Sequence, residues 1–185
     1  MYSSRLLHGE RVYLDAIQRA DIPQFAAWFA DLEFLGYLSP RAVFPMTEDD
    51  ETEWYERMRQ SDNVTFAIRT RDEHLLIGNL GLNAIDWRSR WATFGIAVGD
   101  KNFWGQGYGP EATRLLLRYA FRELNLNRVE LSVHSFNKRA IKSYEKCGFQ
   151  HEGTRRQAVY RDSAYYDIHI MAILRSEWVA QQANT

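Results

Sequence analysis

The segment from Phe94 to Leu117, FGIAVGDKNFWGQGYGPEATRLLL, constrains the fold of this chain more than any other. It starts as a strand, turns through glycines at 105, 107 and 109, and continues from Pro110 as an amphipathic helix. Glycine tolerates positive φ and lets a ligand approach the backbone closely. Successive N–H groups in front of a helix N-terminus favour an anion such as a diphosphate. The segment therefore predicts an α/β fold with a phosphate site at the turn.

Two well-known phosphate-binding loops match the glycine turn less well. A Walker A loop ends in G-K-[ST], whereas this turn ends in G-Y-G-P-E. A Rossmann fingerprint reads G-x-G-x-x-G with an acidic residue about 20 positions later, and the spacing here is G-x-G-x-G. The remaining alternative is a flexible connection that binds nothing. The strongly amphipathic helix directly behind the turn favours the anion site instead.

The rest of the chain predicts a mixed α/β pattern with a largely antiparallel sheet. Strands are expected at residues 11–14, 64–69, 75–84, 91–98, 128–133, 149–159 and 165–174. Helices are expected after a cap at Asp21, over 47–58, from 109 onward and over 137–147, with residues 31–47 rich in turns. No repeat or Ser/Gly-rich linker divides the chain, so we expect a single domain over residues 1–185.

Composition excludes several classes of protein. With 23 Lys and Arg against 24 Asp and Glu, the formal net charge is −1, which argues against a nucleic-acid binder. The single cysteine, Cys147, excludes an intrachain disulfide and fits a reducing compartment. Neither a secretory signal nor an apolar run of about 18 residues is visible, so we expect a soluble, cytoplasmic protein. The five histidines have no metal-ligand spacing and no companion cysteine pair, which predicts no metal site.

Two motifs together resemble the GCN5-related N-acetyltransferase (GNAT) family. The first is Phe94–Glu111, and the second is Asn137–Phe149, NKRAIKSYEKCGF, which matches the family pattern N-x-x-A-x-x-x-Y-x-K-x-G-F. Either motif alone is loose, but both in this order, separated by one helix and one strand, are specific. The segment HGERVYLDAIQRADI is similar to the first strand and helix, and IGNLGLNAIDW to the third strand, of the branch that contains ribosomal-protein N-terminal and polyamine acetyltransferases.

The resemblance implies a fold and a cosubstrate, acetyl-CoA. The GNAT fold is a mixed, mostly antiparallel sheet with helices on both faces and a V-shaped splay between the central strands. The implied cofactor-binding residues are the backbone of Ile96, Ala97 and Val98 for the pantetheine arm, the amides of Trp104, Gly105, Gln106, Gly107, Tyr108 and Gly109 for the diphosphate, and Asn137 for the pantetheine region. The family often has Arg or Gln where Trp104 stands, although this branch accepts an aromatic residue.

The resemblance also implies direct attack of an amine on the thioester, with Tyr144 protonating the leaving thiolate. Tyr144 shares a helix face with Ala140 and Ile141, so its alternative role is that of a core aromatic. A backbone N–H near Ala97 or Val98 would stabilise the oxyanion. Some relatives use a glutamate base, but Thr93 and Ser132 occupy the matching positions here. The candidates for the base are therefore Asp86 or a water held by Ser132.

The acceptor depends on how readily its amine loses a proton. A peptide α-amine has a pKa of about 7.7–8.0, so on the order of a tenth is neutral at pH 7, against less than about a thousandth for a lysine or polyamine amine. A weak base thus favours a protein N-terminal α-amine. Polyamines, amino sugars and antibiotics stay open as acceptors, as does a catalytically silent CoA-binding module. The resemblance further implies a homodimer, while the net charge and the lack of a long apolar run predict no partnership with nucleic acid or membrane.

Overall fold

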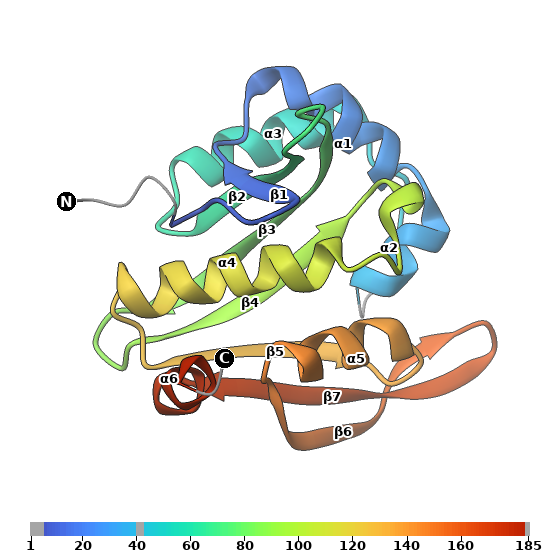
Figure 1. Ribbon diagram of the computed structural model, residues 1–185. Coiled ribbons are helices and arrows are strands. Elements are labelled where there is room, and N and C mark those ends of the chain that lie inside the picture. The colour runs from blue at the N-terminus through green and yellow to red at the C-terminus, as the bar shows by residue number, and fades with distance from the viewer. Residues whose placement is uncertain (1–5, 40–42, 184–185) are drawn as a thin grey trace.

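A seven-stranded sheet forms the frame of the computed structural model, which describes residues 6–39 and 43–183 (Figure 1). The strand order is β1-β2-β3-β4-β5-β7-β6, and every neighbouring pair is antiparallel except β4 and β5. The strands are β1 (Val12–Asp15), β2 (Val64–Thr70), β3 (Leu76–Asp86), β4 (Trp91–Val98), β5 (Arg128–His134), β6 (Gln150–Arg161) and β7 (Ala164–Leu174). The predicted largely antiparallel sheet is confirmed.

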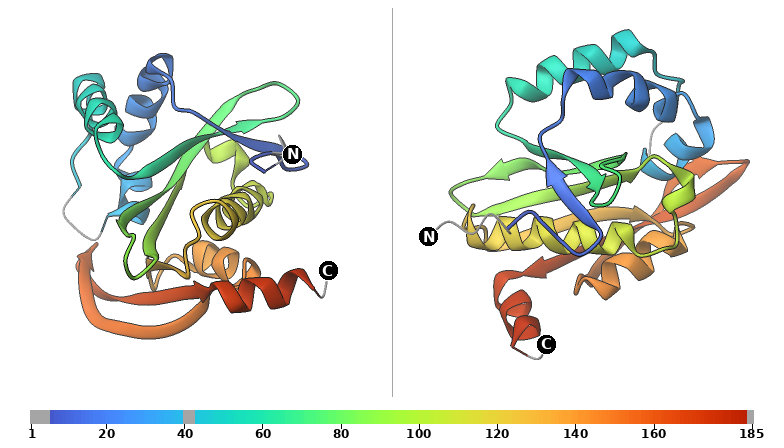
Figure 2. Two further views of the ribbon diagram at one scale, coloured as in Figure 1. Left: turned by 90° about the vertical axis from the view of Figure 1, so that its left-hand side faces the viewer. Right: turned by 45° about the horizontal axis from the view of Figure 1, so that its top comes forward.

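Helices cover both faces of the sheet, as Figure 2 shows from two further directions. They are α1 (Ile22–Phe29), α2 (Leu32–Leu38), α3 (Glu48–Arg59), α4 (Tyr108–Arg122), α5 (Lys138–Lys146) and α6 (Arg175–Gln182), with short 3₁₀ turns η1 (Arg19–Asp21) and η2 (Lys101–Phe103). Helices α4 and α5 lie on one face, and α1 and α3 lie on the other. No helix in the described part of the chain combines the length and apolar character that a membrane span requires.

The main hydrophobic core lies between the sheet and helices α4 and α5. Helix α4 forms because its apolar residues recur at helical spacing, and that stripe, including Ala112, Leu116 and Phe121, is fully buried. A smaller cluster around Phe25 and Tyr55 packs α1 and α3 against Ala67 on the opposite face. The sheet is thereby held rigidly from both sides.

The two central strands separate soon after they meet. β4 pairs with β5 only from Trp91 to Thr93, although β4 continues to Val98 and β5 to His134. Beyond this point β5 keeps its pairing with β7, while β4 keeps its pairing with β3. The result is the V-shaped opening that the resemblance implied.

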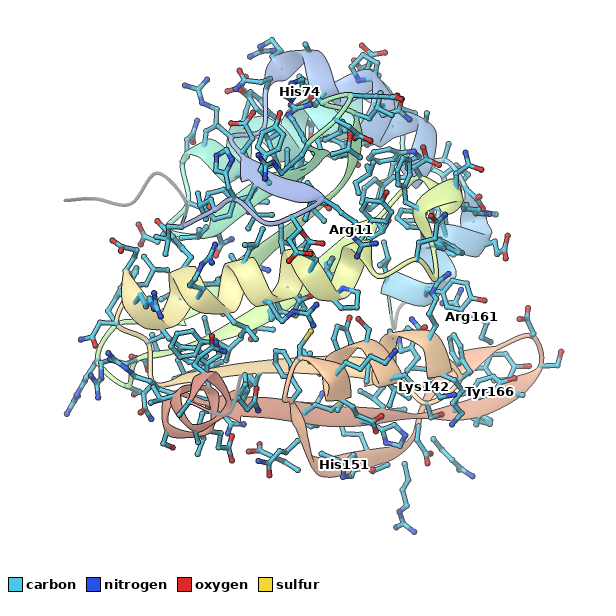
Figure 3. All side chains as sticks on the ribbon, in the orientation of Figure 1. Arg11, His74, Lys142, His151, Arg161 and Tyr166 are labelled. Carbon is cyan, nitrogen blue, oxygen red and sulfur yellow. The ribbon has the colours of Figure 1, made fainter. Side chains whose placement is uncertain are left out.

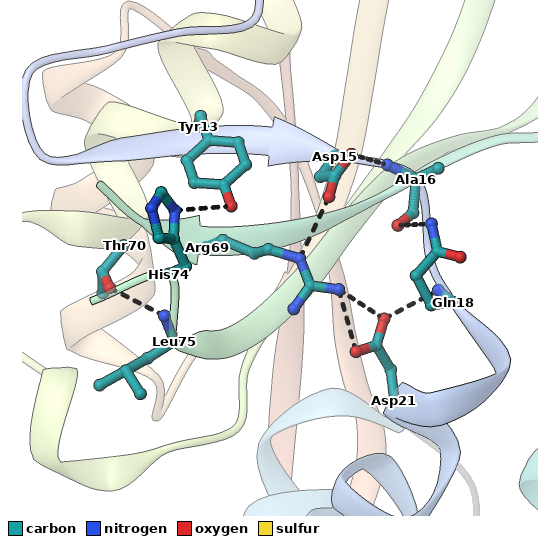
Figure 4. Close-up of polar contacts among 9 residues, drawn as sticks. All are labelled: Tyr13, Asp15, Ala16, Gln18, Asp21, Arg69, Thr70, His74 and Leu75. Carbon is teal, nitrogen blue, oxygen red and sulfur yellow. Dashed lines mark hydrogen bonds and ion pairs between the residues drawn. The ribbon is translucent and has the colours of Figure 1, made fainter. Parts of the chain in front are cut away.

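An ion-pair network joins α1 to the sheet (Figure 4). Arg69 on β2 donates to both carboxylate oxygens of Asp21 at 2.9 and 2.8 Å and to Asp15 at 3.3 Å. The sequence predicted Asp21 as a side-chain cap of α1, and this is wrong. Its carboxylate accepts from the backbone N–H of Gln18 and from Arg69, and makes no capping bond to α1.

Three other local features differ from the predictions. Residues 32–38 form helix α2 rather than turns, because the Asp31 carboxylate accepts from the N–H groups of Glu33 and Phe34 and starts a helix there. Pro40, part of the turn-rich prediction, lies outside the described residues. Helix α4 starts at Tyr108, so Pro110 is its third residue, where a missing N–H still costs no intrahelical bond. Helix α6 had not been predicted.

Candidate active site

A cleft of about 1080 Å³ opens where β4 and β5 separate. Its lining comes from α2, α3, β2, β3, β4, the glycine turn, the end of β5 and α5. Among the residues predicted from sequence, it is lined by Ile96, Ala97, Val98, Trp104, Gly105, Gln106, Gly107, Gly109, Ser132, Asn137 and Tyr144. The lining does not include Tyr108, whose ring packs against Phe103, or Asp86. Helices α2 and α3 also line the cleft, with Phe34, Tyr37, Leu38, Trp54, Arg57 and Met58.

At the end of β4, every second residue points its backbone N–H and C=O groups toward the opening. The Ala97 carbonyl lies so close to Gly78 on β3 that a side chain there would collide with it. Because polar groups of successive strand residues point to opposite neighbours, Ile96 and Val98, not Ala97, turn theirs toward the cleft. The Val98 carbonyl accepts from the indole N–H of Trp104 at 2.6 Å. Of the three residues whose backbone was predicted to bind the pantetheine arm, Ile96 and Val98 face the cleft. The prediction for Ala97 is wrong, because its backbone groups face β3.

The glycine turn has the backbone geometry of an anion site. Gly105 and Gly107 have φ of 73° and 90°, and Gly107 is the N-cap of α4. The N–H groups of Tyr108 and Gly109 lie in the first turn of α4, where helices offer no internal acceptor. The Trp104 N–H donates to the Lys101 carbonyl, so its predicted place among the diphosphate-binding amides is wrong. Trp104 contributes its ring to the wall instead.

Arg11 and Glu111 hold the turn in place, and the sequence analysis missed both. Arg11, which lies above the start of α4 in Figure 3, donates from its guanidinium to the Gln106 carbonyl at 2.8 Å and to Glu111 at 3.1 Å. Glu111 also accepts from the backbone N–H groups of Arg11 and Val12. Burial alone would raise the pKa of Glu111, but these hydrogen bonds outweigh it and lower the pKa.

Positive charge borders the cleft on the α5 side. Arg139 lies over the Trp104 ring, 3.7 Å from its centroid, and Phe34 stacks against the same ring from α2. Lys142, labelled in Figure 3, and Lys146 also line the cleft. A ligand with several phosphates would meet these cations together with the amides of the turn.

Asn137 caps α5 from inside the cleft. Its side-chain oxygen accepts from the Ala140 N–H at 3.2 Å, and the residue is only 8% exposed. The carboxamide NH₂ group keeps two donors for a ligand. The cap therefore fixes the direction in which Asn137 can bind.

Tyr144 contacts the core and the cleft at once. Its ring packs edge-on against Phe94 and Phe149, and the residue lines the cleft. Burial, with a smaller effect of Cys147, raises the pKa of Tyr144 above its ordinary value, while Arg139 acts in the opposite direction. The phenol therefore stays protonated and keeps a proton to donate.

Asp86 is a turn residue, so its predicted role as a base is wrong. Its carboxylate accepts from the N–H groups of Arg88 and Ser89 at 2.9 and 2.8 Å in the hairpin between β3 and β4. It pairs with Trp91, at the end of β4 opposite the glycine turn. The hydrogen bonds from Ser89 contribute most to a lowered pKa, which makes Asp86 a poor proton acceptor. Ser132, the other candidate, does line the cleft.

A histidine that the sequence analysis considered only as a metal ligand lines the cleft two residues after Ser132. His134 is 5% exposed, and its Nδ1 has no hydrogen-bond partner. Alternation along β5 places Ser132 and His134 on one face, which is the signal that could have found it. Cys147, by contrast, is buried beside the Pro110 carbonyl, and burial raises the pKa of its thiol to about 11. Among the described residues, no three His, Cys, Asp or Glu side chains cluster as metal ligands would.

The acceptor side of the cleft is rich in amides and hydroxyls. Asn63, Asn79, Asn83, Thr65 and Thr93 line it, together with Trp54, Arg57 and Met58 of α3. Within the described part of the chain, no Asp or Glu belongs to the lining. The cleft is therefore neutral to positive throughout.

Comparisons with known proteins agree with this geometry. A family model described as an acetyltransferase (GNAT) domain matches residues 11–150. The SPbeta prophage-derived uncharacterized N-acetyltransferase YokL of Bacillus subtilis (strain 168) is 31% identical over 172 residues, 92% of this chain and 93% of that protein. The putative ribosomal N-acetyltransferase YdaF of the same organism is 33% identical over 107 residues, 58% of each chain. The spermidine N-acetyltransferase of Vibrio cholerae, solved in complex with CoA and spermine, superposes with a TM-score of 0.82 at 25% identity, over 91% of this chain and 98% of that one.

Proposed function

The chain belongs to the GNAT acetyltransferase family, and we propose that it acetylates the α-amine of a protein N-terminus. The coarser activity follows from family membership: the protein is an acetyl-CoA-dependent N-acetyltransferase. What this chain adds is the arrangement of residues around the cleft between β4 and β5.

Acetyl-CoA, the acetyl donor, occupies the part of the cleft formed by β4, the glycine turn and α5. The turn amides from Gly105 to Gly109 bind the diphosphate, and the nearby α5 cations reinforce this binding. The pantetheine arm runs along the backbone groups of Ile96 and Val98 in the manner of an added strand. Asn137 contributes its free NH₂ donors.

Acetyl transfer needs one proton donor at the leaving group and one site for negative charge. The amine nitrogen attacks the thioester carbon, a C–N bond forms, and the nitrogen gives up one N–H proton to a base. The charge on oxygen is met by a backbone N–H of β4, that of Val98. When the C–S bond breaks, Tyr144 donates its phenolic proton to the thiolate. Its raised pKa keeps that proton in place until the thiolate forms.

We favour the α-amine over a polyamine because the described lining of the cleft contains no carboxylate. A polyamine brings further ammonium groups, and a desolvated ammonium without a carboxylate partner is costly. No described lining residue is Asp or Glu. A peptide N-terminus brings a single amine, of which on the order of a tenth is already neutral at pH 7. Its backbone also offers N–H and C=O groups that match the amides of Asn63, Asn79 and Asn83.

A polyamine is the second candidate. The likeness to the Vibrio cholerae spermidine N-acetyltransferase, in sequence and in structure, supports it. The two candidates differ in one measurable respect, because a polyamine must find carboxylates and a peptide need not.

An acceptor comparison tests the proposal. A short peptide with a free N-terminus, the same peptide with a blocked N-terminus, spermidine and an aminoglycoside are supplied side by side with acetyl-CoA, and released CoA thiol is measured. The free peptide is expected to exceed spermidine in kcat/KM by at least about tenfold, and the blocked peptide to be inert. A higher value for spermidine or the aminoglycoside, or equal turnover of both peptides, would overturn the α-amine proposal.

The family resemblance also leads us to propose a homodimer. Gel filtration with light scattering at several protein concentrations tests it, and a monomer mass throughout would contradict it.

A further inference from the structure

The last residue of β5 brings an unsatisfied polar atom to the cleft. His134 is 5% exposed, and its Nδ1 is buried without a hydrogen-bond partner. Leaving such an atom unpaired is unfavourable, and buried polar atoms in proteins almost always have partners. Since His134 lines the cleft, a bound ligand can supply the missing partner.

The strand register places His134 beside the reacting centre. Thr93 pairs with Glu130, so continuing the parallel register sets Gly95 against Ser132 and Ala97 against His134 across the opening. A Cβ at Gly95 would meet only the amide of Asn83, at 3.9 Å, so this face of the opening has room for an acceptor.

Tyr144 lies on the other face of the same opening. Its ring contacts Phe94, which points away from the face that Thr93 and Gly95 share, because side chains alternate along a strand. Tyr144 and His134 therefore flank a thioester in the opening from opposite faces. One face suits the leaving sulfur, and the other suits the incoming amine.

The surroundings of His134 keep its ring neutral. Burial is the largest effect that lowers the pKa of His134, and the guanidinium of Arg161 adds to it, while a hydrogen bond to the backbone of Gly36 acts in the opposite direction. Arg161, labelled in Figure 3, reaches from β6 to the end of α2, where it donates to the Ser39 carbonyl at 3.2 Å. A neutral imidazole has a lone pair that can accept a proton.

We propose that His134 is the catalytic base, and that its Nδ1 accepts the proton which the acceptor amine loses on attacking the thioester. This rests on the proposed function in one respect, namely that the thioester lies in the cleft. As the C–N bond forms, one N–H proton passes to His134, and as the C–S bond breaks, the Tyr144 proton passes to sulfur. His134 then releases its proton to solvent and Tyr144 regains one, so the enzyme returns to its starting state.

Other titratable or charged groups lie on the elements near His134. They are Arg161 of β6, Tyr37 of α2, Tyr166 and Asp167 of β7, Arg139 of α5 and, on the same strand, Glu130, which is paired with Arg128. Arg161 alone among them contributes to the lowered pKa of His134. This singles out Arg161 as a positioning residue whose replacement should change the titration of the base.

A glutamine substitution separates proton transfer from packing. His134→Gln keeps a polar side chain of similar reach but accepts no proton, so kcat is expected to fall about 100-fold with unchanged affinity for CoA in calorimetry. The matched control is His169→Gln, since His169 bonds Thr154 outside the cleft and its loss should leave kcat unchanged. The assay uses whichever amine the wild-type enzyme acetylates, so failure of the α-amine proposal does not obscure the result.

The pH profile distinguishes a base from a merely structural histidine. Below the pKa of the amine, log kcat/KM of the wild type should fall with slope one, and with slope two once His134 is also protonated. The second limb should vanish in His134→Gln. In Arg161→Gln, which removes the charge, the second limb should move to higher pH. An unchanged kcat in His134→Gln, or a rate lowered equally at every pH with both limbs retained, would overturn the assignment.

Discussion

The donor side and the acceptor side of the cleft are built in different ways. The donor side comes from consecutive parts of the chain, β4, the glycine turn and α4, joined by α5, and it uses mainly backbone: positive φ at Gly105 and Gly107 and the first turn of α4. The acceptor side is assembled by side chains from α2, α3, β2, β3 and β5, which are far apart in sequence.

This difference bears on what each side can recognise. Backbone amides with fixed geometry suit a ligand that does not vary from one reaction to the next, as the cosubstrate acetyl-CoA does not. Side chains on separate elements can be replaced one at a time without disturbing the frame, which suits a variable acceptor. The comparison predicts that substitutions on the donor side change CoA binding, and those on the acceptor side change stability or chemistry at constant CoA affinity.

The largest effect is expected from the ion-pair network that fixes α1, the helix against which α3 of the acceptor side packs. Arg69→Met leaves Asp21, a buried carboxylate, without its cation, so the free energy of unfolding in urea is expected to fall by about 3 kcal/mol. Arg128→Met is the matched control, because the carboxylates of Glu130 and Glu152 that it leaves behind are part-exposed, and it should cost about 1 kcal/mol or less. Equal losses in the two variants would show that the Arg69 network does not anchor α1.

The next largest effect is expected at Tyr144, where the donor side and the acceptor side of the cleft meet. Tyr144→Phe removes the proton donor but keeps the ring contacts with Phe94 and Phe149, so kcat is expected to fall about 100-fold. Calorimetry should show unchanged affinity for CoA. Wild-type kcat in this variant would assign Tyr144 to the core alone.

A substitution at Gly107 is expected to weaken CoA binding on the donor side. At Gly107, φ of 90° strains any other residue by about 1–2 kcal/mol, and an added Cβ would lie 2.9 Å from Arg11 Nη2. Gly107→Ala should weaken CoA binding about tenfold in calorimetry. Gly153→Ala is the control, since its Cβ would meet nothing within 4 Å and its φ is unstrained. Comparable CoA affinity in both variants would contradict the role of the turn.

The smallest expected effect concerns the support of the turn. Glu111→Gln should lower stability at pH 7 by about 1 kcal/mol, because three hydrogen bonds lose their charge. The pKa of Glu111 is lowered by folding, so its contribution is present above the ordinary carboxyl pKa and disappears as pH falls through the lowered value. Urea unfolding of both proteins from pH 7 to below pH 4 measures the difference. A gap that persists at the acidic end would contradict this account.

The same comparison explains what could be predicted from sequence. The donor side was predictable because its determinants are local: glycines, a helix start and the Asn137 motif lie in two short segments, and β4 has the predicted bounds Trp91–Val98. The details that depend on packing were not. The Trp104 amide is satisfied within its own turn, and Arg11 approaches the turn from the other end of the chain.

The acceptor side could be predicted only in outline. Asp86 follows a strand as a catalytic carboxylate can, but its position relative to the cleft depends on the hairpin that it closes. Helix α2 was not predicted because it contains Gly36, which disfavours a helix. The pKa of His134 depends on Arg161, which only the folded sheet brings close. Residues that act through tertiary neighbours leave no spacing in the sequence.

A crystal structure with bound CoA tests the central claim most directly. We predict diphosphate oxygens within hydrogen-bond distance of the amides between Gly105 and Gly109, and the sulfur in the opening with Tyr144 on one face and His134 on the other. A diphosphate bound away from the glycine turn, or a sulfur outside the opening between β4 and β5, would contradict the account.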